Sequence, residues 1–262
     1  MTWNLWWRFG PWQQRQPAIL ETLRAQAPDI VCLQEVWAED RGSDQAADLA
    51  QQLGYFHARS PAPYWEGFAF SNAVLSRWPI MSSESMALPR ADGEPGHRTA
   101  ILVWIDAPFG PVPVVSTHLD YPFDQSAQRV AQVQALCTFV AAKRGNPETS
   151  FPVVIGADLN AVPDSDEIRA LTGRSTPPIQ GLVFQDSWEL AGDGLPGWTW
   201  HGANPHLSEA TWPNRRLDYL LVSWPRPRHL GTPMRCWIAG DEPVDGVVGS
   251  DHYAVVADLR AG

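Results

Sequence analysis

The sequence predicts an α/β protein in which β-sheets stack on one another and helices cover their outer faces. Helix-like and strand-like segments alternate at both ends of the chain, and a run of strand-like segments occupies its middle. This order favours stacked sheets over a single doubly wound sheet. The 262 residues contain no internal repeat, low-complexity tract or linker, so we expect one domain over residues 1–262.

The helices are expected where apolar residues recur at helical spacing. In the first helix, Pro17 falls in the first turn, where a missing N–H is tolerated. Gly54 is expected to end the second helix. Asp124 and Asp164 are expected to cap the third and fourth helices through their carboxylates. The expected helices lie around residues 17–23, 46–53, 125–143 and 168–171.

The strands are expected where short apolar or alternating runs are bounded by proline, glycine and polar residues. A first short strand contains Asn4, and irregular sequence is expected between the fourth helix and residue 215. The remaining expected strands lie within residues 29–37, 55–59, 67–76, 79–88, 98–105, 111–119, 151–160, 215–223 and 252–259.

Polar side chains stand at the ends of several of these strands. Each has an ordinary explanation taken alone: Glu35 as a solvated strand end, Asn160 as a turn former, Asp158 as a helix cap, or Asp218 paired with Arg215 or Arg216. Their recurrence at strand ends is harder to explain in this way, because loops of layered α/β proteins converge at one edge. The residues concerned are Asn4, Gln34, Glu35, His118, Asp120, Asp158, Asn160, Asp218, Asp251 and His252.

A cluster of this kind predicts a metal site, because carboxylates packed together repel one another unless they hold a cation. The set offers oxygen and imidazole ligands and no cysteine. It therefore suits Mg²⁺ or Mn²⁺, with Ca²⁺ as a further possibility, better than structural zinc. A hard cation beside Asn, Asp and His side chains is suited to the hydrolysis of a phosphoester.

Composition restricts the partners and the compartment. The formal net charge is −10 and Lys143 is the only lysine, so nucleic acid is possible as a ligand but disfavoured. No apolar run approaches the ~20 residues of a transmembrane helix, and the N-terminus does not resemble a signal peptide. Three cysteines in strand-like or helix-like contexts indicate buried thiols, which makes a cytoplasmic location the default expectation. The sequence does not define an oligomeric state.

The order of the motifs resembles the metal-dependent endonuclease/exonuclease/phosphatase superfamily, which has a DNase I-like fold. The motifs are "TWNLWW", "LQEVW", "STHLD", "GADLN", "RRLDYLLVS" and "GSDHYAVVADL", and they run from near residue 2 to residue 259. The combination of "GADLN", "RLDY" and "GSDH" is specific, whereas "LQE" alone would be weak. The resemblance implies a four-layer α/β/β/α sandwich of two packed mixed β-sheets flanked by helices.

The resemblance also implies a division of roles among the polar residues. Glu35 would be the principal metal ligand, with Asn4 beside it and Asp251 assisting with metal or water. Asp158 would activate the attacking water, and Asn160 would hold the phosphate. The two imidazoles would stabilise the transition state, and a buried carboxylate would orient the second of them. These residues are His118, His252 and Asp218, respectively.

Three departures favour the histidine-bearing phosphodiesterase branch over the abasic-site nucleases. Trp6 replaces an acidic residue, "STHLD" carries a histidine in place of a tyrosine, and the chain is acidic. The expected activity is hydrolysis of a small or medium phosphodiester. The alternatives are a nuclease or a tyrosyl-DNA-phosphodiesterase-like enzyme acting on DNA ends, and a non-catalytic binding module. An aromatic rim for an aryl or lipid substituent is expected from Trp65, Tyr121, Phe123, Trp200 and Trp212.

Overall fold

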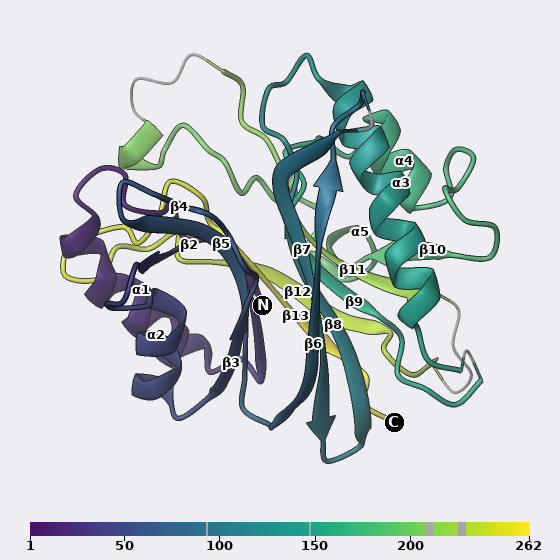
Figure 1. Cartoon of the computed structure of the whole chain (residues 1–262), viewed down its shortest axis with the longest axis horizontal. Helices are drawn as coiled ribbons and strands as arrows, with labels where there is room; N and C mark the ends of the chain where they lie inside the picture. The colour runs from purple at the N-terminus through teal and green to yellow at the C-terminus, as the bar shows by residue number, and fades with distance from the viewer. Residues whose placement is uncertain (93, 147, 208–211, 225–228) are drawn as a thin grey trace.

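The computed structural model describes residues 1–92, 94–146, 148–207, 212–224 and 229–262. Two mixed β-sheets pack face to face, and helices cover the outer face of each sheet (Figure 1). The helices α1 (Trp12–Gln26) and α2 (Gln45–Leu53) lie on one side, and α3 (Ser126–Lys143) and α4 (Asp166–Leu171) on the other. This arrangement confirms the expected four-layer sandwich.

The first sheet has the strand order β12-β13-β1-β2-β5-β3, and the short strand β4 pairs with β5. β1 therefore lies inside the sheet, parallel to β2 and antiparallel to β13. The strands are β1 (Thr2–Asn4), β2 (Ile30–Glu39), β3 (Phe56–Arg59), β4 (Tyr64–Trp65), β5 (Phe68–Ser76), β12 (Pro233–Ala239) and β13 (Ala254–Leu259).

The second sheet has the strand order β10-β11-β9-β8-β7-β6. Here β8 and β9 are parallel, and β11 is antiparallel to β9. The strands are β6 (Ile80–Pro89), β7 (Pro95–Ala107), β8 (Gly110–His118), β9 (Val154–Asp158), β10 (Val183–Asp186) and β11 (Asp218–Trp224).

Three apolar cores hold the four layers together. One joins α1 and α2 to the first sheet through residues such as Ile19, Leu23 and Leu33. A second lies between the two sheets, and a third joins α3 and α4 to the second sheet. All three cysteines are buried free thiols, as the sequence predicts. No helix in the described part of the chain is long and apolar enough to span a membrane.

Most of the expected elements are present, and the differences have physical reasons. The expected irregular stretch before residue 215 contains β10, the short helix α5 (Ser187–Ala191) and a 3₁₀ turn over Pro205–Leu207. The strands β4, β10 and β12 were not expected, and each has a single strand partner. An edge strand is stabilised on one side only, so its sequence carries a weaker strand pattern.

The helix starts also differ from the expectation. α1 begins at Trp12, so Pro17 lies in its second turn and not in its first. Neither α3 nor α4 has a side-chain cap: Gln125 and Ser165 occupy the N-cap positions in place of the expected aspartates, and the hydroxyl of Ser165 donates to the carbonyl of Val162 instead. Those aspartates are Asp124 and Asp164. α2 ends as expected at Gly54, whose φ of 71° closes the helix in the left-handed conformation.

Candidate active site

The strand topology brings five of the expected site residues to one edge of the two sheets. Asn4 ends β1, and His118 and Asp158 end the parallel strands β8 and β9. Asp218 begins β11 and pairs directly with Asp158. His252 precedes β13, which runs antiparallel to β1, so it reaches the sheet from the same edge. The pairing of the strands therefore accounts for the clustering of these five side chains.

The carboxylate of Asp158 is at the centre of this cluster. It is buried, and Oδ2 accepts a hydrogen bond of 2.9 Å from the side-chain amide of Asn4. Oδ1 accepts a bond of 2.9 Å from the backbone N–H of Asn160. Burial and the nearby Asp218 raise the pKa of Asp158 to about 6. Asp158 is thus held in one orientation and is basic enough to accept a proton from water.

His252 is oriented from behind by Asp218. Its Nδ1 lies 2.8 Å from Asp218 Oδ2, and its Nε2 lies 3.8 Å from Asp158 Oδ2. Burial lowers the pKa of His252, but Asp218, Asp158 and Asp251 outweigh burial and raise it well above its usual value. The imidazole is therefore a cation at neutral pH, facing the centre of the cluster.

Glu35 reaches the site through a local irregularity of β2. The β2–β5 register shifts between Leu33 and Val36, and Glu35 takes a φ of 54° at this bulge. A bulge redirects a side chain, and a positive φ in a non-glycine residue costs on the order of 1–3 kcal/mol. Burial and the neighbouring Asp251 raise the pKa of Glu35 to about 7. Its buried Oε2 has no hydrogen-bond partner among the described residues.

His118 lies between Asn160 and Arg98. The amide nitrogen of Asn160 lies 2.9 Å from Nε2, and Nη1 of Arg98 lies 3.1 Å from Nδ1. Burial, Arg98 and His252 lower the pKa of His118 well below its usual value, so this imidazole is neutral. Asp120 accepts from Arg98 Nε at 3.3 Å and thereby fixes the guanidinium. The two histidines of the site thus carry different charges.

Asp251 completes the acidic side of the site. It borders the same cavity as Glu35, and Ser250 Oγ donates to its Oδ1 at 3.4 Å. Ser250 Oγ also donates to the backbone oxygen of Asn4 at 2.6 Å. Burial raises the pKa of Asp251. The turn before β13 is therefore joined directly to the end of β1.

A cavity of about 470 Å³ opens over these side chains. It exposes seven of the eight residues expected to hold metal or act in catalysis; Asp218 lies behind His252 and does not line it. Four of the five expected aromatic residues also line it: Tyr121, Phe123, Trp200 and Trp212. The fifth, Trp65, is not part of this wall, because it belongs to the β4–β5 hairpin, where it is 67% exposed.

Five residues that line the cavity were not expected from the sequence: Trp6, Phe9, Arg98, Pro122 and Leu217. Trp6 and Phe9 follow Asn4 directly, so their closeness along the chain is the signal that could have identified them. Arg98 belongs to β7, and its approach to His118 depends on the antiparallel pairing of β7 with β8. A pairing of that kind leaves no local sequence signal.

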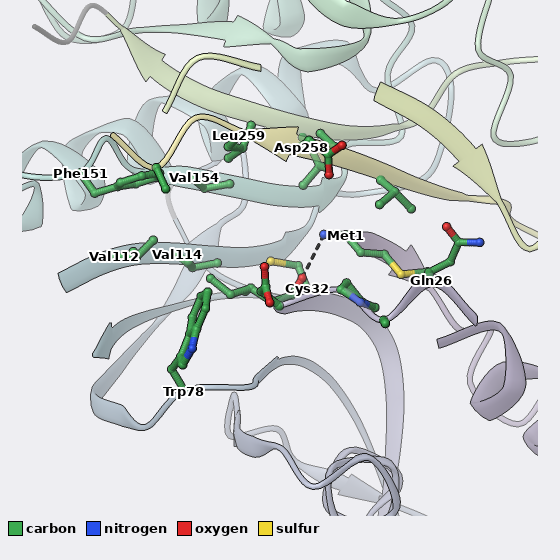
Figure 2. Close-up of a pocket in the computed structure, with 18 of the residues that line it drawn as sticks. Met1, Gln26, Cys32, Trp78, Val112, Val114, Phe151, Val154, Asp258 and Leu259 are labelled. Carbon is green, nitrogen blue, oxygen red and sulfur yellow. Dashed lines mark hydrogen bonds between the residues drawn. The ribbon is translucent and has the colours of Figure 1, made fainter. Parts of the chain in front are cut away.

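A second cavity, of about 270 Å³, lies at another edge of the sandwich and has a different character (Figure 2). Most of the residues that line it are of apolar types, among them Trp78, Phe109, Phe151 and Val154. None of the expected catalytic or metal-binding residues lines it. The expected catalytic and metal-binding residues are therefore gathered at the cavity above Asp158 and not at this second cavity.

The donors of the site fit a hard divalent cation. Glu35 Oε2 and Asp218 Oδ1 are buried without a partner among the described residues, and an uncompensated buried carboxylate oxygen is costly. Ligand atoms of Asp158, Asp218 and His252 also lie within 4.8 Å of one another, but the cationic His252 has no lone pair to offer a metal ion. The oxygen donors suit Mg²⁺, Mn²⁺ or Ca²⁺. The fold and the site together define a metal-dependent phosphoric ester hydrolase.

Comparison with known proteins gives the family. The model of the endonuclease/exonuclease/phosphatase family matches residues 1–252, and the chain belongs to this family. The protein angel of Drosophila melanogaster is 27% identical over an alignment of 281 positions, which covers 95% of this chain and 72% of that protein.

Two solved structures show the same fold. An endonuclease/exonuclease/phosphatase from Beutenbergia cavernae superposes with a TM-score of 0.74 at 25% identity, covering 99% of this chain and 70% of that one. The D. rerio TDP2 complexed with single strand DNA product has a TM-score of 0.73 at 20% identity, covering 99% and 97% of the two chains.

Proposed function

We propose that the protein is a divalent-metal-dependent phosphodiesterase that hydrolyses a P–O bond of a small or medium phosphodiester. One observation carries this proposal. The buried carboxylate of Asp158 is fixed by Asn4 and Asn160 at the floor of a cavity, between one neutral and one cationic imidazole. This is the arrangement that an attacking water and a negatively charged phosphoryl group require.

Glu35 is the proposed principal metal ligand, with Asn4 and Asp251 beside it. Glu35 borders the cavity with a free buried oxygen, whereas the carboxylate of Asp218 already binds His252. Asn4 Oδ1 accepts from the N–H of Trp6, and its second lone pair is available to a cation. A bound Mg²⁺ or Mn²⁺ would polarise the phosphoryl oxygens and offset their charge.

The protein side chains supply the remaining chemistry. Asp158 takes a proton from water as the water oxygen forms a bond to phosphorus and the bond to the leaving oxygen breaks. Asn160 and the neutral His118 orient the phosphoryl oxygens. The cationic His252, supported by Asp218, stabilises the negative charge that grows in the transition state.

The aromatic rim is the proposed binding surface for the substituent of the diester. Phe123 packs against Trp200 and Trp212 with ring centroids 6.3 and 5.0 Å apart. The guanidinium of Arg215 lies 4.1 Å from the Phe123 ring and fixes this edge of the wall. The exposed side chain of Tyr121 stands on the same loop as Phe123. A flat or apolar substituent would be desolvated against these rings.

The test is a panel of chromogenic phosphomonoesters, phosphodiesters and phosphotriesters, assayed with EDTA and then with metal added back. We expect diesters to be hydrolysed fastest and activity to require Mg²⁺ or Mn²⁺. A preference for monoesters would contradict the diester assignment. A protein that binds Mn²⁺ but hydrolyses no ester would be a binding module.

A second candidate is an enzyme that processes DNA ends. The exposed aromatic rings beside Arg98 and Arg215 would suit stacked bases of a single strand, and the similar D. rerio TDP2 was solved with a single strand DNA product. The net charge of −10 opposes this candidate. Salt dependence separates the two, because phosphate-tracking DNA binding weakens steeply with salt.

A further inference from the structure

Arg15 is a buried arginine that the proposed chemistry does not use. It stands in the first turns of α1, and its side chain has no exposure to solvent. Burial lowers its pKa to about 10. A buried guanidinium is unfavourable unless its donors are satisfied. Its partners therefore show what it contributes to the fold.

Arg15 donates five hydrogen bonds, and all of them go to backbone carbonyl oxygens. Nη1 donates at 2.8 Å to Leu5 and at 2.8 Å to Gly249. Nη2 donates to Trp6, Trp7 and Phe9, at 3.0, 3.1 and 3.0 Å. One side chain thus joins the turn after Asn4 to the turn before "SDH", although these segments lie at opposite ends of the sequence.

Both turns need to be held. Trp6 and Trp7 have φ values of 56° and 37°, a conformation that bulky residues adopt only when their surroundings impose it. At Gly249, a Cβ would lie 2.9 Å from the ring of Trp3, so this turn packs directly against β1. Bonds from a charged donor are stronger than those between neutral groups, which suits Arg15 to fixing strained carbonyls.

The two turns carry functional side chains. Asn4 immediately precedes one turn, and Trp6 within it lines the cavity and lies 4.8 Å from the Arg15 guanidinium. Asp251 and His252 immediately follow the other turn. Arg15 therefore supports the acidic side of the site from behind.

We propose that Arg15 is a positioning residue that fixes the turn after Asn4 against the turn before Asp251, so that the proposed metal-binding residues of both segments face one another. This inference rests on the proposed function. Arg15 contacts neither substrate nor cation in this role and acts through the backbone carbonyls of residues 5–7, 9 and 249 and through the ring of Trp6.

The experiment compares Arg15→Gln and Arg15→Lys with the native protein. Mn²⁺ affinity is measured by electron paramagnetic resonance, and kcat and KM are measured on the best diester. For Arg15→Gln we expect Mn²⁺ affinity and kcat to fall by ~10–100-fold, as for other groups that orient ligands, with KM within about twofold of native. Arg15→Lys keeps the charge but offers fewer donors in a different geometry, so we expect an intermediate loss.

Arg59→Gln is the matched control. Arg59 pairs with Asp44 at 2.6 Å and with Ser71 Oγ at 2.8 Å, away from the cavity, so this variant loses stability without losing Mn²⁺ affinity or kcat. Native Mn²⁺ affinity and kcat in Arg15→Gln would overturn the inference. If Arg15→Gln does not fold, Arg15→Lys is the test instead. Native Mn²⁺ affinity together with native kcat in Arg15→Lys would also overturn the inference. An inactive native protein would instead overturn the proposed function.

Discussion

The carboxylate of Asp218 lies 2.8 Å from Nδ1 of His252, and both side chains are buried, with Asp218 behind the ring that borders the cavity. A carboxylate in this position fixes the orientation of the ring and keeps it protonated. Asp218 Oδ2 makes this contact, and Oδ1 has no hydrogen-bond partner among the described residues. The pair therefore sets both the geometry and the charge of His252.

Replacing Asp218 with Asn should lower kcat by ~10–100-fold, because the imidazole loses its orienting partner. The alkaline limb of the pH profile should also move to lower pH. In the native protein Asp218 raises the pKa of His252, so the cation persists above neutral pH; without that charge it is lost earlier. Asp44→Asn, which breaks an ion pair with Arg59, is the control for lost stability. An unmoved alkaline limb would contradict the assignment.

Replacing Asp158 with Asn should reduce kcat by ~10²–10⁴-fold, because the amide cannot accept the proton of the attacking water. The variant keeps the size of the side chain, so it should fold and retain substrate binding. Steady-state kinetics on the best diester measure the effect. Asp164→Asn makes the same change on an exposed side chain and should leave kcat unchanged. Turnover near the native rate in Asp158→Asn would exclude Asp158 as the base.

Metal binding should stabilise the protein more at pH 8 than at pH 5. Burial raises the pKa of Glu35 to about 7 and that of Asp158 to about 6, so the folded protein binds these protons more tightly than the unfolded chain. The stability that these protons provide is present at low pH and is lost as pH rises through those values. Above those pH values, a bound cation offsets the negative charge of the ionised, buried carboxylates of Glu35 and Asp158.

Thermal unfolding with EDTA or with Mn²⁺ measures this difference. At ~100 times the dissociation constant, bound metal contributes about 2.7 kcal/mol, which raises Tm by about 5–10 °C in a chain of this size. The increase should appear at pH 8 and be small at pH 5. Glu35→Gln should abolish most of the increase at pH 8. An equal increase in native protein and variant would remove Glu35 from the metal site.

Replacing Phe123 with Ala should raise KM for aryl diesters and leave KM for a dimethyl diester nearly unchanged. Phe123 packs against Trp200 and Trp212 and is thereby held at the cavity wall. An aromatic contact between Phe123 and an aryl group of the substrate would contribute about 0.5–1.5 kcal/mol beyond the buried area. The expected increase in KM is therefore about 2–10-fold. Phe56→Ala removes an exposed ring from β3, outside the cavity, and is the control. Equal losses on both substrates would show that the rim does not select the substituent.

Much of the candidate site could be predicted because its residues interrupt otherwise apolar strands. His118 and Asp158 each end a buried strand, and strand register alone brings them together. The conformations that aim the side chains had no such signal. The bulge at Glu35, with its positive φ, arises from tertiary packing, which can override local preference.

The errors have a common origin in pairing across the fold. Arg98 was missed because only the antiparallel β7–β8 pairing places it beside His118. Trp65 was expected in the rim because it is a large aromatic residue in a loop-like stretch. The β4–β5 hairpin holds it outside the cavity wall. An aromatic residue in a loop-like stretch of sequence thus cannot be assigned to a particular cavity wall until the strand pairing is known.

The position of β1 between β13 and β2 has a consequence for biosynthesis. The indole N–H of Trp3 donates to the carbonyl of His252 at 2.9 Å, across 249 positions of sequence. A ribosome adds about 5–20 residues each second, so the nascent chain waits tens of seconds before the last strand arrives to complete the sheet and the site. The first sheet and the candidate site therefore cannot be completed until the chain has been synthesised through β13.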